Sequence, residues 1–169
     1  YGYDLAETLC TQAKIVSKNP LIQKDAKNAP SSVMYYKVQG SFIESYPNMI
    51  LKEKTPQKGH SFNFGPYFLH ETEEYWTIDE LKDATKHLDG KEGNVAKTSI
   101  RKWMTDMHQN IEMAKQAAAR SYAMLSASTK GTFQKAITPQ KRTLSEDVFY
   151  PAADLLDLNT ILNQKTKEG

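Results

Sequence analysis

The sequence predicts a mainly α-helical fold, a single domain spanning residues 1–169 around one long central helix, with an α+β fold as the alternative. Two helix starts with capping-box spacing support this class, and so does an apolar seam that runs from Ile100 to Leu125 in steps of four and three. A stretch rich in Pro and Gly at about 45–76 interrupts the periodicity. Strands are therefore expected only as a small β-hairpin.

The first helix is predicted over residues 4–18. Asp4 and Glu7 have capping-box spacing, and apolar residues then recur at helical intervals. Cys10 is expected to be a small buried residue on this helix. Asn19-Pro20 offers a second helix start, which predicts one or two further turns before residue 28.

Residues 33–44 are ambiguous between a strand that turns at Gln39-Gly40 and a short helix. The following segment, 45–76, is predicted to be an irregular, aromatic-rich loop that carries at most one short strand at 49–52.

The second clear helix start is Thr77 with Glu80, and this helix is expected to stop at Asp89-Gly90. After a polar connection at 91–94, the central helix is predicted to run from Thr98 or Ser99 to about Ser128. Its seam consists of Ile100, Met104, Met107, Ile111, Ala114, Ala118, Ser121 and Leu125.

Thr129-Lys130-Gly131 is typical of a helix end, so a basic connecting loop is expected up to residue 142. Ser145 and Pro151 each offer a start for the last helix, whose apolar positions run from Ala152 to Leu162.

Composition excludes several classes of protein. The chain has 169 residues, 39% of them apolar, and a formal net charge of +2, which is ordinary for a folded domain and too balanced for disorder. No apolar run is long enough for a membrane span, and a single cysteine permits no internal disulfide and no cysteine-based zinc site. The first residue, Tyr1, is expected to reflect processing or excision, which slightly favours an extracytoplasmic location over a cytoplasmic one.

No motif for phosphate binding, metalloprotease chemistry or serine hydrolysis occurs, so the sequence favours a non-enzyme without a metal or cofactor. His108 and Glu112 have the spacing of a metal-ligand pair, but two ligands do not close a site, and a solvated helix face is expected. A hydrolase that uses His70, Glu74 or His87 is the weakest alternative.

The strongest candidate binding site is the aromatic segment that precedes Thr77, because aromatic rings with a few polar groups line ligand pockets. The same rings are also suited to form a private core for the loop. The candidate residues are Phe62, Phe64, Tyr67, Phe68, His70, Glu74, Tyr75 and Trp76.

Charge is distributed unevenly along the chain. Residues 97–142 contain 9 basic and 2 acidic side chains, which suggests either an internal electrostatic match or a basic face for an anionic partner. The basic residues are spread out and no nucleic-acid motif is present, which argues against nucleic acid as that partner.

The leading hypothesis is therefore a protein-protein interaction or assembly module, an extracytoplasmic component of a larger bacterial complex, that uses the long helix to bind a partner or a second copy. The alternative is a small-ligand-binding sensor domain excised from a receptor, with the aromatic loop as the lid of its pocket.

Overall fold

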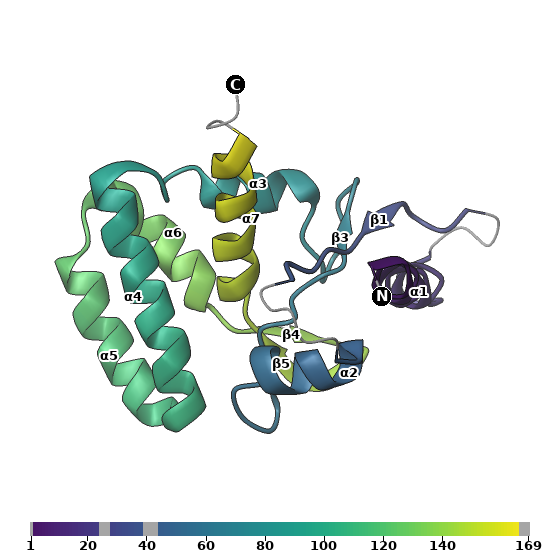
Figure 1. Ribbon diagram of the computed structural model, residues 1–169, viewed down its shortest axis with the longest axis horizontal. Helices are drawn as coiled ribbons and strands as arrows, with labels where there is room; N and C mark the ends of the chain where they lie inside the picture. The colour runs from purple at the N-terminus through teal and green to yellow at the C-terminus, as the bar shows by residue number, and fades with distance from the viewer. Residues whose placement is uncertain (1, 24–27, 39–43, 166–169) are drawn as a thin grey trace.

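The computed structural model describes residues 2–23, 28–38 and 44–165, which form seven α-helices, one π-helix and five short strands (Figure 1). The mainly α-helical class is confirmed, and the strands form two small sheets. Among the described residues, no helix is both long enough and apolar enough to cross a membrane.

Helix α1 (Gly2–Ser17) confirms the first predicted helix. Its buried residues, Leu5, Leu9, Ala13 and Ser17, recur every fourth position and form one stripe. Leu5 and Leu9 share a small apolar cluster with Met49 of α2 (Tyr46–Met49). Cys10 is exposed, so the prediction of a buried residue is wrong. The reason is its position one residue, about 100° of helix rotation, beyond the buried Leu9.

Residues 33–44 were open between a strand and a short helix, and among the described residues of this segment Val33 alone belongs to a strand. Strand β1 (Ser32–Val33) pairs antiparallel with β3 (Tyr67–Phe68), with Ser32 opposite Phe68. Residues 34–38 are neither helix nor strand, and 39–43 lie outside the described residues, so the predicted return strand is not described.

The segment predicted as an irregular loop contains α2 and the π-helix η1 (Ile50–Lys54), where a strand had been predicted. Pro47 lies in the first turn of α2, where a helix needs no N–H from it.

Helix α3 (Ile78–Thr85) begins with the predicted capping box. The Thr77 N–H donates to Glu80 Oε2 at 2.7 Å, and the Glu80 N–H donates to Thr77 Oγ1 at 3.1 Å. The helix ends before Asp89, and α4 (Gly90–Gln109) starts where a polar connection was predicted. Gly90 makes this abrupt start possible because its φ is +72°, a conformation that favours glycine.

The predicted long central helix is broken at Asn110, so the prediction of one continuous helix is wrong. Helix α4 ends at Gln109, and α5 (Ile111–Met124) folds back beside it (Figure 1). Asn110 has an extended backbone, and its side chain accepts the N–H groups of Glu112 and Met113 at 2.9 and 3.1 Å. This N-cap starts a new helix within the seam.

Two further predictions after α5 are wrong. Helix α6 (Ala127–Ile137) replaces the predicted connecting loop, with Gly131 in its interior. Strand β5 (Ser145–Phe149) begins where a helix start was proposed, pairs antiparallel with β4 (Gln140–Arg142) and pairs parallel with β2 (His60–Ser61). The last helix, α7 (Ala152–Lys165), follows Pro151 as predicted.

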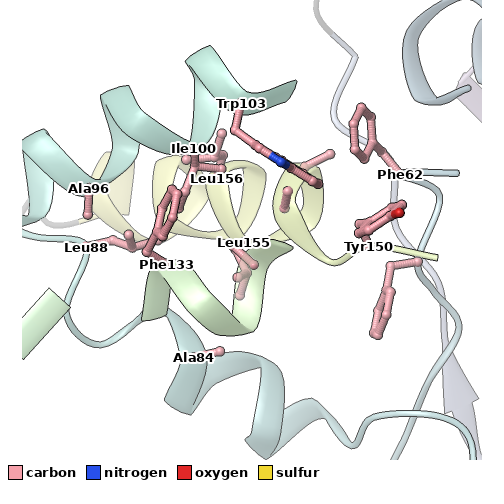
Figure 2. Packing of buried hydrophobic residues seen from close by; sticks show 14 of the residues in the cluster. Phe62, Ala84, Leu88, Ala96, Ile100, Trp103, Phe133, Tyr150, Leu155 and Leu156 are labelled. Carbon is pink, nitrogen blue, oxygen red and sulfur yellow. The ribbon is translucent and has the colours of Figure 1, made fainter. Parts of the chain in front are cut away.

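The main core lies between α4, α6 and α7, where the fully buried Ile100, Phe133 and Leu155 meet (Figure 2). At one end of this core, Trp103 makes edge-to-face contacts with Phe62 at a ring-centroid distance of 5.8 Å and with Tyr150 at 5.3 Å. The core thus joins the aromatic segment to helices that lie much later in the chain.

Candidate functional site

An apolar groove lies between α4, α5 and α6 and has a volume of about 510 Å³. We call it the α4–α6 groove. We call the buried α4 residues Trp103 and Met107 the floor of the groove and the lining residues of α5 and α6 its walls; Pro139, just before β4, and Tyr150 complete the lining. Its lining residues are Trp103, Met107, Ile111, Lys115, Ala118, Ala119, Tyr122, Gln134, Ile137, Pro139 and Tyr150.

The walls of the groove are more accessible than its floor. Trp103 and Met107 are buried, whereas Tyr122 keeps 39% of its surface exposed and Ala119 is exposed. Accessible wall residues beside a buried apolar floor suit the binding of an apolar side chain, because the floor residues do not have to move when that side chain binds.

Two lysine side chains lie at the groove. Lys115 lines it, and Lys130 Nζ lies 5.3 Å from the centroid of the Tyr122 ring. Lys115 pairs with Glu112 at 2.8 Å, but both side chains are mostly exposed, so that surface ion pair is weak. The ammonium group of Lys115 is therefore accessible to a binding partner at the edge of the groove.

The seam predicted as a partner surface is used largely inside the protein. Ile100 and Met107 of α4 share the core with Ala114 and Ala118 of α5, because the Asn110 break lets the two helices pack against each other. Met107, Ile111 and Ala118 of the seam also line the groove beside this packing.

The aromatic candidates are mostly core residues. Phe62, Phe64, Tyr67, Phe68 and Tyr75 are buried, and Trp76 is half-buried. Tyr67 stacks on Tyr35 at 6.0 Å, and Phe64 meets Trp76 edge to face at 5.0 Å. The rings therefore stabilise the segment from within, and they do not form an accessible aromatic lid.

Arg142, which sequence reasoning missed, occupies the centre of this aromatic cluster. Its guanidinium carbon lies 4.7 Å from the ring centroid of Phe64, 4.2 Å from that of Tyr75 and 4.3 Å from that of Phe149. The guanidinium also donates to the carbonyl oxygen atoms of Phe64 and Gly65. Part of the basic excess counted in the sequence is thus consumed by a structural cation-π cluster.

His70 and Glu74 line a separate cavity of about 530 Å³ together with Thr143. His87 does not line it, so the three residues of the proposed hydrolase do not converge. Thr143 donates to Glu74 through both its hydroxyl and its N–H, which lowers the pKa of that carboxyl. A carboxylate held in its charged form by two donors is a stabilising contact and a poor proton donor at neutral pH.

A network of buried charges surrounds Asp154 of α7. Lys54 Nζ donates to Asp157 Oδ2 at 3.0 Å and to Asp154 Oδ1 at 3.4 Å. Tyr67 Oη donates to Asp154 Oδ2 at 2.6 Å, and Tyr35 Oη donates to the Asp154 carbonyl oxygen at 2.7 Å. This network, which we call the Asp154 network, connects η1, the aromatic segment and the last helix.

Asp154 and Asp157 interrupt the apolar pattern of the last helix, which is the one signal of this network in the sequence. Their partner Lys54 lies 100 residues before Asp154, and no local spacing connects the two. Burial raises the pKa of Asp154, and the nearby Lys54 opposes that rise. The pKa of Lys54 is lowered by its own burial, but the two carboxylates outweigh this effect and raise it overall.

The free energy of unfolding should decrease at alkaline pH, because buried tyrosine hydroxyls keep their protons in the folded protein and release them in the unfolded chain. Burial raises the pKa of Tyr46 to about 12, and burial followed by the charge of Asp154 raises the pKa of Tyr35 and Tyr67. The folded protein keeps protons that the unfolded chain releases, so this stability is complete below the ordinary tyrosine pKa of about 10 and is lost above it. Urea unfolding from about pH 8 to about pH 11 measures this decline.

A Tyr35→Phe variant is the control for this prediction, because it keeps the ring and has no proton to lose. Its free energy of unfolding should fall less steeply with pH than that of the unmodified protein. A flat pH profile in the unmodified protein would contradict the role assigned to these tyrosines.

The predicted solvated face for His108 and Glu112 is split between two helices. His108 ends α4 and Glu112 begins α5, so the pair does not share one helix face. Within the described parts of the chain, no group of three or more His, Cys, Asp or Glu side chains is arranged to hold a metal ion.

No known family model, curated protein or solved structure matches this chain.

Proposed function

We propose that this protein is a non-enzymatic binding module that holds an acidic, amphipathic segment of a partner protein in the α4–α6 groove. The observation that carries the proposal is the groove itself, an accessible apolar surface with a buried Trp103 floor and an exposed Tyr122 wall. Grooves between helices commonly receive the apolar face of a helical segment.

The size of the groove fits this role. Its volume of about 510 Å³ lies within the range of about 300–1,000 Å³ that specific pockets occupy, and its lining combines aromatic, Met and Ile side chains. Aromatic and Met side chains are also enriched at the centres of protein interfaces. The groove therefore offers anchor sites for one or a few apolar side chains.

Charge complementarity indicates an acidic partner. Lys115 lines the groove, and Lys130 Nζ lies 5.3 Å from the centroid of the Tyr122 ring. A segment with Asp or Glu beside its apolar positions would meet favourable potential at the rim, which speeds association and selects against basic partners.

A pair of synthetic peptides tests the proposal. One peptide carries Leu at helical spacing with Glu at the flanking positions, and the other has Lys in place of every Glu. The acidic peptide should bind at least about tenfold more tightly, a difference of about 1.4 kcal/mol, in a nuclear magnetic resonance titration. The shifted resonances should include those of Trp103, Ala119 and Tyr122.

Ala119→Glu is the matched variant for this titration, because Ala119 is exposed and lines the groove. This substitution should weaken the binding of the acidic peptide at least about tenfold, because the two negative charges repel each other. Met113→Glu adds the same charge at an exposed position of α5 outside the groove lining and should leave affinity within about twofold.

Equal binding of both peptides, or equal effects of the two variants, would overturn the proposal. Light scattering on the protein alone tests the competing occupant, a second copy of this chain. Self-association abolished by Ala119→Glu would show that the groove binds another copy in place of an acidic partner.

A further inference from the structure

A third cavity, more polar in its lining than the α4–α6 groove, lies between η1, α4 and α7 and has a volume of about 580 Å³. Lys37, Lys54 and Arg101 contribute three cationic groups to its lining, while Met104 and Leu156 contribute apolar surface. We call it the Lys54 cavity. It does not share a lining residue with the α4–α6 groove.

The two acidic groups of the cavity already accept hydrogen bonds. Asp157 Oδ2 accepts from Lys54 at 3.0 Å, and Glu53 accepts from the Tyr36 hydroxyl. Lys37 and Arg101, in contrast, make no ion pair with any acid in the described part of the chain. Lys54 is thus compensated by Asp154 and Asp157, whereas the charges of Lys37 and Arg101 are not held in an ion pair among the described residues.

Lys54 adds a buried donor to these two cationic groups. Its side chain is only 9% exposed, and its ammonium group has three N–H donors, of which Asp154 and Asp157 take two. Lys54 Nζ also lies 6.0 Å from the centroid of the Tyr36 ring. A ligand oxygen that reaches its third N–H would form a charge-assisted hydrogen bond in a buried setting, where such a bond is stronger than at an exposed lysine.

The backbone under Lys54 is itself unusual. Residues 50–54 form a π-helical turn, a geometry that is rare and occurs frequently at functional sites. This turn ends at Lys54, whose ammonium group forms an ion pair with Asp157 of α7.

We propose that the Lys54 cavity binds a small organic oxyanion, with its phosphate or carboxylate group held by Arg101, Lys37 and the remaining donor of Lys54, and its apolar part held against Met104 and Leu156. The planar guanidinium of Arg101 matches the two oxygen atoms of either group. This inference is independent of the proposed peptide groove.

Calorimetric titration with probes of similar size and different charge tests the proposal. Phenyl phosphate, benzoate and benzyl alcohol share an aromatic ring, but only the first two carry an oxyanion. At least one oxyanion should bind, and benzyl alcohol should bind at least about tenfold more weakly, because it cannot form the charge-assisted hydrogen bonds. The ranking of phenyl phosphate against benzoate then distinguishes a phosphate ligand from a carboxylate ligand.

Two variants locate the binding. Arg101→Gln should weaken the binding of the preferred oxyanion at least about tenfold, and Lys37→Gln should also weaken it. Arg120→Gln removes the same charge from an exposed position outside the cavity lining and should have no effect beyond about twofold.

The proposal is overturned if benzyl alcohol binds as well as the oxyanions, if no probe binds at about 10 mM, or if Arg101→Gln and Arg120→Gln behave alike. Ala119→Glu should retain oxyanion binding. That variant therefore separates a failure of the Lys54 cavity from a failure of the α4–α6 groove.

Discussion

Replacing Gly93 by alanine should lower the free energy of unfolding by about 3 kcal/mol or more. A Cβ atom at this position would lie 2.2 Å from the Leu88 carbonyl carbon and 2.4 Å from its oxygen. Both are backbone atoms next to a fully buried side chain, so neither can move aside without shifting the start of α4. Urea unfolding followed by circular dichroism measures the loss.

Gly131→Ala is the matched control, because this glycine also lies within a helix. Nothing lies within 4 Å of the Cβ position of Gly131, and the residue is exposed in the interior of α6. Alanine there should raise the free energy of unfolding by about 0.5–1 kcal/mol, since helical glycine is unfavourable. Equal effects of the two substitutions would contradict the close approach described for Gly93.

Replacing Lys54 by methionine should cost about 3–5 kcal/mol, because it removes the cation that compensates two buried carboxylates. The methionine side chain is similar in length to the lysine side chain, so the lost charge, and not an empty cavity, should dominate the effect. Part of the loss should be recovered on acidification, since protonation of Asp154 removes an uncompensated charge. Denaturant unfolding at about pH 7 and about pH 5 measures both effects.

Lys52→Met provides the comparison within the same π-helical turn. Lys52 pairs with Glu44 at 2.5 Å, but its side chain is 66% exposed. Its removal should change the free energy of unfolding by less than about 1 kcal/mol. A loss for Lys54→Met no larger than that for Lys52→Met would show that the Asp154 network does not hold the fold together.

The broken central helix shows what hydrophobic periodicity predicts and what it misses. The seam from Ile100 to Leu125 correctly identifies buried positions, because α5 folds back and presents its seam residues to α4. Periodicity is the same for one straight helix and for two helices packed face to face. The distinguishing signal is Asn110, whose side chain caps α5, and a single Asn within an apolar pattern is a weak signal.

Elements that depend only on neighbouring residues in the sequence could be predicted. The Thr77 capping box and the helix after Pro151 need only their own neighbours, and both were predicted. Strand β5 forms a local hairpin with β4 that was not predicted, and it also pairs with β2, which lies far earlier in the chain and which no local spacing connects to it. The same limit applies to Arg142, because two of its three aromatic partners, Phe64 and Tyr75, lie in the aromatic segment far earlier in the chain.

The aromatic segment was open to two interpretations, a ligand pocket and an internal core. Five of its six rings are buried in the structure, and Trp76 is half-buried. Exposure cannot be read from a cluster of rings, because a ligand pocket and a private core have the same composition. The α4–α6 groove escaped prediction because it depends on the packing of three helices.

The hydrogen bond from Tyr67 to Asp154 joins residues that lie 87 positions apart, so it sets an order of events on the ribosome. At synthesis rates of about 5–20 residues per second, the aromatic segment waits on the order of ten seconds for the helix that covers it. During that interval its rings have no native burial partner from α7. A chain stopped before residue 150 should therefore expose these rings and associate through them, which makes the last helix the element that ends the aggregation-prone stage of folding.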